Sequence, residues 1–133
     1  MAKAKQSLEL VEGLLTEKSA ILSQAQALTT MGMQQSAQAL WASAATLEER
    51  IAPLLDASGD DLEAAVHRIS AASCYEKAGD PSRATNFYRA ALAGPLRDVT
   101  RKEVEQMLAA CLARLKAFRQ AKEPEKSRPH RKA

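Results

Sequence analysis

The stretch that decides the fold runs from Ala71 to Leu92 and reads AASCYEKAGDPSRATNFYRAAL. It contains two helix-forming segments separated by Gly-Asp-Pro at positions 79–81. Glycine commonly ends a helix, and aspartate followed by proline is a favourable start for the next one. Small residues lie where the two helices would touch, and Tyr75, Phe87 and Tyr88 fill the space beside them. The stretch therefore predicts an antiparallel helical hairpin, a unit that usually serves as a scaffold for binding.

The composition of the chain extends this prediction to its full length. A chain of 133 residues has the size of one domain, and its few aromatic, glycine and proline residues favour helix over sheet. No apolar run is long enough to cross a membrane. The segment 1–6 also lacks the apolar stretch of a secretory signal. We therefore expect an all-α protein in the cytoplasm, without contact to a membrane.

Apolar residues at helical spacing predict about five helices. A single helical domain over residues 6–122 would consist of two hairpins and a closing helix, with a short tail at residues 1–5. The residues from 123 onward contain prolines and basic groups but no large apolar side chain, which predicts a disordered basic tail. The predicted parts are hairpins 6–57 and 60–94, the closing helix 100–122, and the tail 123–133.

Local signals place the ends of these helices. Asp60 and Thr100 are each followed three residues later by a glutamate, the pattern of a capping box, so we expect helices to begin after both. Asp80 is expected to cap the helix that begins with Pro81. Pro53 removes one backbone hydrogen bond, and we expect a kink or a frayed last turn near it.

The chain also contains an internal repeat. When Gly32 is aligned with Gly79, 47 positions later, small and bulky residues match on both sides of the turn. A match on both sides predicts a second hairpin of the same design. The matched pairs are Ala25 with Ala72, Leu28 with Tyr75, Ala37 with Ala84, Trp41 with Tyr88, and Ala44 with Ala91.

The second unit resembles the tetratricopeptide repeat (TPR). The family pattern places a small residue and an aromatic before a Gly-Asp-type turn, and alanine, aromatic and alanine after it. Arg68 departs from this pattern, since the family usually has a large residue at that place. The residues that carry the resemblance are Ala72, Tyr75, Gly79, Asp80, Ala84, Tyr88 and Ala91.

The resemblance implies a short TPR-like solenoid of stacked antiparallel hairpins, whose first helices line a concave groove. It also implies a protein–protein interaction scaffold or adaptor that binds a peptide or helix of a partner. The groove would lack the lysine-and-asparagine cluster with which some family members hold a carboxylate, which favours a partner with apolar anchors. The partner-binding residues implied for this chain are Ser19, Leu22, Gln26, Thr29, Ile69, Ser73, Glu76 and Lys77.

An alternative function follows from the distribution of charge. Residues 1–113 carry 11 basic and 14 acidic side chains, whereas residues 114–133 carry 8 basic and 2 acidic ones. The chain could instead be a self-associating structural or regulatory bundle whose basic C-terminal tail contacts nucleic acid or an acidic protein. Since basic tails are more often merely solubilising, we do not expect a nucleic-acid partner. A stack of two hairpins leaves an apolar face uncovered, which allows a homodimer.

The sequence shows no chemistry of an enzyme, and we expect no cofactor and no metal. His67 is the only histidine of the predicted helices and is interpreted as a solvent-facing or half-buried helix residue, not as a ligand. The acidic pairs 48–49 and 60–61 are interpreted as capping and solvating groups. Cys74 and Cys111 are expected to be reduced and to pack as small apolar residues. Trp41, the only tryptophan, is expected to anchor the contact between helices rather than to be an exposed binding residue.

Overall fold

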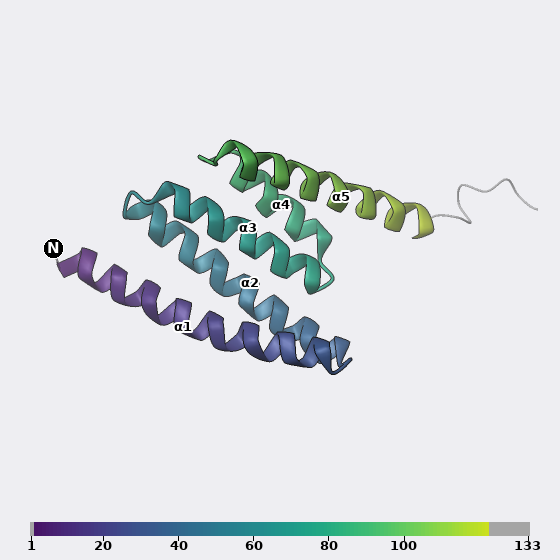
Figure 1. Cartoon of the computed structure of the whole chain (residues 1–133), viewed down its shortest axis with the longest axis horizontal. Coiled ribbons are helices and arrows are strands. Elements are labelled where there is room, and N and C mark those ends of the chain that lie inside the picture. Colours follow the sequence, from purple (N-terminus) through teal and green to yellow (C-terminus); the bar gives the residue numbers. More distant parts are fainter. Residues whose placement is uncertain (1, 123–133) are drawn as a thin grey trace, which may run out of the picture.

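The computed structural model describes residues 2–122, with side chains described from residue 5 to residue 121. The predicted tail 123–133 therefore lies outside the described residues. The described part of the chain is all-helical, with five helices and no strand, as predicted (Figure 1). The helices are α1 (Ala2–Thr30), α2 (Gln34–Ala57), α3 (Asp61–Lys77), α4 (Pro81–Leu92) and α5 (Asp98–Lys122).

Each helix packs on the next one along the chain. In Figure 1 the helices follow one another in chain order, from α1 at the lower edge to α5 at the upper edge. Short turns join the first four helices, so that neighbours run in opposite directions. As a consequence α1 and α3 lie on either side of α2, and the C-terminal half of α5 extends past the other helices (Figure 1).

Small side chains make these helix contacts close. Ala25 and Ala72, on the first helix of each hairpin, and Ala37 and Ala84, on the second, are at most 1 % exposed. Alanine carries only a methyl group beyond the backbone, which allows helix axes to approach closely. Trp41, Tyr75, Tyr88 and Val104 complete the main core beside these alanines.

A second core cluster lies at the other end of the α1–α2 hairpin. It consists of Val11 and Leu14 from α1 and Leu47 and Ile51 from α2, all at most 6 % exposed. This spacing of three and four residues is the one that the sequence shows along both helices. The two clusters together hold α1 against α2 along most of its length.

The helix ends differ from the prediction in three places. The backbone of α1 is helical from Ala2, four residues earlier than expected, and α2 continues through Pro53 to Ala57. The fifth helix begins at Asp98 because the N–H of Arg101 bonds to the carbonyl of Arg97. Proline within the last turns of a helix loses only one backbone bond, which the surrounding packing of α2 can offset.

The expected caps are realised only in part. The Asp80 carboxylate accepts a hydrogen bond from the N–H of Arg83 at 3.1 Å, which confirms the cap of α4. Asp60 stands at the cap position of α3 but makes no capping bond with its side chain. The guanidinium of Arg101 instead closes the turn before α5, since it donates to the carbonyls of Leu92 and Gly94 at 2.8 and 3.0 Å.

The two hairpins share a turn of the same geometry. In the first, the N–H of Gly32 bonds to the carbonyl of Thr29 and that of Met33 to Leu28. The second repeats both bonds 47 positions later, with Gly79 and Asp80 as donors and Glu76 and Tyr75 as acceptors. Gly32 and Gly79 have φ of 78° and 83°, a conformation that side chains other than glycine rarely adopt.

One side-chain hydrogen bond also recurs at this offset. The indole N–H of Trp41 on α2 donates to the hydroxyl of Thr29 on α1 at 3.2 Å. The hydroxyl of Tyr88 on α4 likewise donates to the carboxylate of Glu76 on α3. Both aromatic residues are buried, and each bond crosses from the second helix of a hairpin to the last turn of the first. The two hairpins therefore share their buried alanines and this polar contact at the 47-residue offset. The turn between α2 and α3 has the same geometry as well, with Gly59 at φ of 81°.

The residue that departs from the TPR pattern has a specific contact. Arg68 on α3 forms an ion pair with Asp56 in the last turns of α2. This hydrogen-bonded guanidinium lowers the pKa of the Asp56 carboxyl below its usual value. Arg68 therefore holds α3 against α2 through an ion pair. A large apolar side chain at this position would instead hold the two helices together by hydrophobic packing.

We predict that Ala84→Leu destabilises the fold. Ala84 is fully buried in the main core, and a larger side chain must displace its neighbours. Overpacking of this kind costs about 1–3 kcal/mol in the free energy of unfolding, measurable by urea denaturation. Ala90→Leu is the matched control because Ala90 is exposed on the same helix. Equal stability of the two variants would contradict the close packing of α4.

We also predict a loss of stability at high pH that depends on Tyr88. Burial raises the pKa of Tyr88 to about 12 in the folded chain. The tyrosine of the unfolded chain titrates near 10. The neutral Tyr88 side chain therefore makes its full contribution to the free energy of unfolding below pH 10, and this contribution is lost as the pH rises toward 12. Urea denaturation at several pH values should show that the wild type loses more stability over this range than Tyr88→Phe. Parallel losses in the two proteins would contradict the prediction.

Candidate functional site

A hollow lies between α1 and α3, across the face of α2. Its volume is about 620 Å³, and it is open to solvent. Because α1 and α3 both pack on α2, the surface between them is left uncovered by any helix of the described residues. The hollow is lined by Leu22, Ser23, Gln26 and Ala27 of α1, Trp41 of α2 and Lys77 of α3.

Trp41 is held rigidly in this hollow. Only 6 % of the residue is exposed, and its N–H bonds to Thr29 at 3.2 Å. The hydroxyl of Thr29 in turn donates to the carbonyl of Ala25 at 2.9 Å. A bound molecule would thus meet the accessible part of an aromatic ring whose polar atom already has a partner.

Lys77 contributes the positive charge of the hollow. Its ammonium lies 4.5 Å from the centre of the Trp41 ring, in a cation–π contact. Among the described residues, no carboxylate lies within ion-pair distance of Lys77. The hollow therefore offers apolar surface next to a cation that can still pair with an acidic group.

The structure brings three of the eight predicted partner-binding residues together at this hollow. They are Leu22, which is half-buried, and Gln26 and Lys77, which are exposed. Thr29 lies directly behind Trp41 through its hydrogen bond. Ser19 is exposed one turn before Leu22 on α1.

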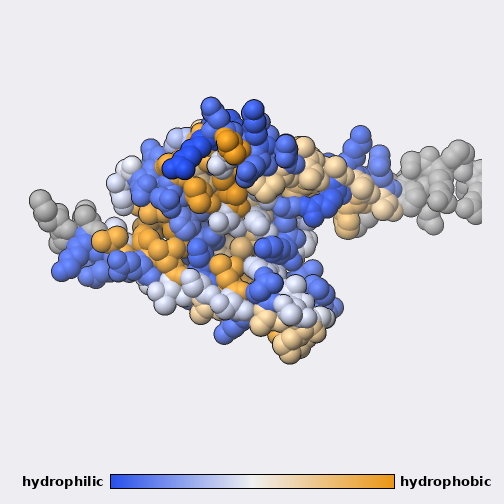
Figure 2. All heavy atoms as spheres, in the orientation of Figure 1, coloured by the Kyte–Doolittle hydropathy of each residue, from blue (hydrophilic) through white to orange (hydrophobic). Residues whose placement is uncertain are grey.

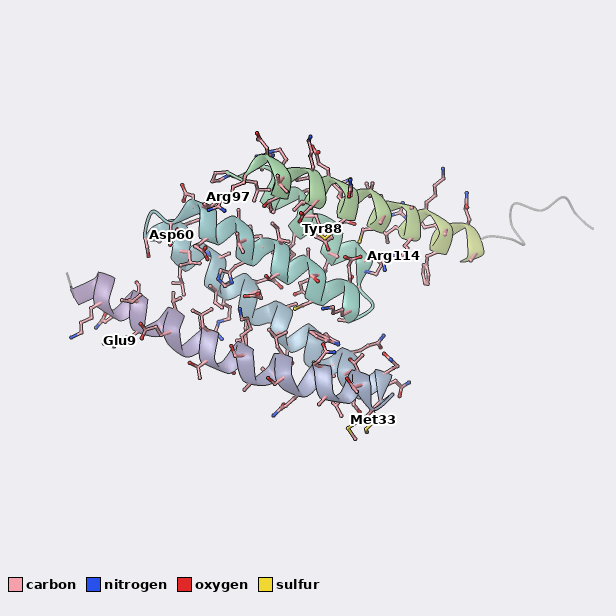
Figure 3. All side chains as sticks on the ribbon, in the orientation of Figure 1. Glu9, Met33, Asp60, Tyr88, Arg97 and Arg114 are labelled. Carbon is pink, nitrogen blue, oxygen red and sulfur yellow. The ribbon has the colours of Figure 1, made fainter. Side chains whose placement is uncertain are left out.

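The other predicted residues lie on α3. Ile69 and Ser73 are half-buried, and Ile69 packs against the main core. Glu76 points toward the later helices: it pairs with Arg114 of α5 and accepts the hydroxyl of Tyr88. Figure 3 shows Arg114 below α5, near the end of α3. Glu76 thus joins α3, α4 and α5, while its neighbour Lys77 faces α1.

The interpretation of Glu48 as a solvating group is wrong. Glu48 is 1 % exposed, and its carboxylate lies 2.7 Å from Nδ1 of His67 and 3.4 Å from the ammonium of Lys18. A buried carboxylate needs such partners to offset its lost hydration. Because Lys18, Glu48 and His67 belong to α1, α2 and α3, this cluster ties three consecutive helices together.

Glu49 points to a different partner from Glu48, as expected for adjacent residues of a helix. Its carboxylate accepts a hydrogen bond from Tyr75, and burial together with this bond raises the pKa of Tyr75. The two cysteines are buried and free, as predicted, and burial raises the pKa of Cys74 to about 11. Within residues described by the structure, no cluster of side chains is suited to hold a metal ion.

Sequence reasoning missed Trp41 as part of the site, because it treated anchoring and binding as alternatives. The residue does both, since a side chain with 6 % exposure is anchored and still lines the hollow. Ser23 and Ala27 were also missed, and nothing in their residue type marks them.

Comparison with known proteins gives no assignment for this chain. No protein-family model matches it, and neither does a curated protein or a solved structure. None of the helices in the described part is both long and apolar enough to span a membrane. The function must therefore be argued from the geometry of the chain itself.

We predict that Thr29→Val destabilises the fold by about 0.5–1.5 kcal/mol, because the indole N–H of Trp41 loses its acceptor. Thr16→Val is the matched control, since Thr16 makes the same bond to its own helix, to Glu12 at 3.0 Å, without a tryptophan. Urea denaturation followed by Trp41 fluorescence measures both. An equal effect of the two substitutions would show that the Trp41 bond adds no stability.

Proposed function

We propose that this protein is an interaction scaffold that binds a peptide or a helical segment of a partner protein in the hollow between α1 and α3. The observation that carries the proposal is the open hollow of about 620 Å³, with the rigid Trp41 ring in its wall. Binding grooves for peptides typically offer a preformed apolar surface for one or two anchor side chains.

The proposed arrangement of the hairpins is that of a short TPR-like stack. Its support is the recurrence of the buried alanines and of the aromatic hydrogen bond 47 positions apart. In such a stack the first helices of successive hairpins, α1 and α3, line the concave side. The hollow lies between these two helices, as the proposal requires.

The charge of the hollow defines the chemistry of the partner. Leu22 and Trp41 offer apolar surface, and Lys77 is a cation without an acidic partner among the described residues. A peptide with a large apolar side chain next to an aspartate or glutamate satisfies both groups at once. Gln26 and Ser23 can add hydrogen bonds to the peptide backbone.

The proposal is tested with peptides selected from a random display library against the full chain. Trp41 is the only tryptophan, so its emission reports binding in the hollow directly. We predict that selected peptides contain an apolar–acidic pair, change Trp41 emission, and bind at least about tenfold more weakly to the double variant Ser23→Glu/Lys77→Glu, which changes two lining residues of the hollow.

The control is Ser82→Glu/Arg89→Glu, which makes the same changes of charge at two exposed positions of α4. Both double variants should keep the circular dichroism spectrum of the wild type, because none of the four side chains belongs to the core. Selected peptides that leave Trp41 emission unchanged and bind both variants equally would refute a groove between α1 and α3.

A further inference from the structure

The C-terminal end of α5 continues a packing stripe after its cover has ended. Val104, Leu108, Cys111, Leu115 and Phe118 follow one another at steps of four and three residues, which places them on one face of the helix. Val104 and Cys111 are fully buried, whereas Phe118 is 58 % exposed. The same stripe thus passes from a buried interface to an exposed surface within a few turns.

The start of α4 explains where the cover ends. The thiol of Cys111 lies 3.6 Å from the carbonyl oxygen of Pro81, the first residue of α4. Arg114 makes the next contact, with Glu76 near the end of α3. The residues from Leu115 to Lys122 continue for about 12 Å beyond this point, and Figure 1 shows this end projecting past the other helices.

The projecting end is strongly basic. Residues 112–122, here called the α5 arm, read LARLKAFRQAK and contain four basic residues and no acidic one. Of these, Arg114 is paired with Glu76, while Lys116 and Arg119 have no ion pair within the described part of the chain. Figure 2 shows hydrophilic and hydrophobic atoms together on this projecting end.

We propose that the α5 arm is a second interaction surface, which docks an acidic amphipathic helix of a partner protein. Leu112, Leu115 and Phe118 supply apolar anchors in line with the interface that α4 already forms. Lys116 and Arg119 flank these anchors, so the helix that continues this interface needs glutamate or aspartate at its edges. The surface is separate from the hollow between α1 and α3.

Three other occupants would match the apolar and basic side chains of the α5 arm less well than an acidic amphipathic helix. A second copy of the arm would bring two basic surfaces together, which costs electrostatic energy. The segment 123–133 of the same chain has four basic and two acidic residues and no large apolar side chain, so it matches neither property. Nucleic acid would neutralise the charge, but it leaves the apolar anchors without a use.

The test uses the full chain and a dye-labelled synthetic peptide of about 18 residues, long enough to form a helix when bound. The peptide carries leucine at steps of three and four, and glutamate and alanine elsewhere. We expect binding by fluorescence anisotropy, and about tenfold weaker binding to Lys116→Glu/Arg119→Glu. Phe118→Ser should weaken binding to a similar extent, because it removes an apolar anchor.

The matched control is Arg89→Glu/Lys102→Glu, the same charge change at exposed positions of α4 and of the opposite end of α5. This control should bind the peptide within about twofold of the wild type. The hollow variant Ser23→Glu/Lys77→Glu should also bind normally, which keeps this proposal separate from the function proposed for the hollow. The melting temperatures of all variants are compared by thermal denaturation. They should match that of the wild type, because none of these substitutions falls on a core residue.

Five results would overturn the proposal. They are failure of the acidic peptide to bind, equal binding of a peptide in which lysine replaces every glutamate, and unchanged binding by Lys116→Glu/Arg119→Glu. The fourth is salt-dependent binding of single-stranded RNA or duplex DNA in place of the peptide. A chain that forms dimers, and loses them in Phe118→Ser, would also contradict the proposal, since the arm would then be occupied by its own copy.

Discussion

The close approach of neighbouring helices at buried alanines is the constraint on which the rest of this structure depends. Ala25, Ala37, Ala72 and Ala84 are at most 1 % exposed, and each leaves room for the backbone of the facing helix. A core made of such small side chains contributes little apolar area for each contact. The stability of the fold must therefore come from many such contacts and from the larger side chains placed beside them.

The aromatic residues that flank these alanines carry both apolar and polar contacts. Trp41 and Tyr88 are buried, and each donates a hydrogen bond to the last turn of the preceding helix. This bond fixes the position of one helix along the other. Apolar packing alone fixes that position less strictly. The acceptors differ, however, because Thr29 is neutral and Glu76 is charged. The charged acceptor also recruits Arg114, and through it α5 becomes part of the assembly.

The surfaces proposed for binding follow from the way the helices are stacked. Packing between consecutive helices leaves a hollow between α1 and α3, which share α2 as their neighbour. It also leaves the end of an apolar stripe exposed where the 25 residues of α5 pack on the 12 residues of α4. The charges beside the two surfaces are basic, with Lys77 at one and Lys116 and Arg119 at the other. Acidic partner segments are therefore the common expectation for both.

The sequence by itself determined the helices and their hairpins, because these depend on short-range signals. Glycine at positions 32 and 79, the Asp80 cap and the three- and four-residue spacing act within one or two turns of the chain, and the structure contains the helices that they predict. The repeat at 47 positions was readable for the same reason. Of the eight partner-binding candidates that the TPR resemblance implied, Leu22, Gln26 and Lys77 meet at the hollow.

Only the tertiary structure decided which side chains meet across helices. Glu48 and His67 are 19 positions apart, and no pattern in the sequence indicates that their side chains lie 2.7 Å apart in the interior. The position of Trp41 beside Lys77, and the turn at which α4 stops covering α5, likewise depend on how far each helix is shifted along its neighbour. That shift is set by the sum of many small packing contacts over the whole interface, which local sequence signals do not encode.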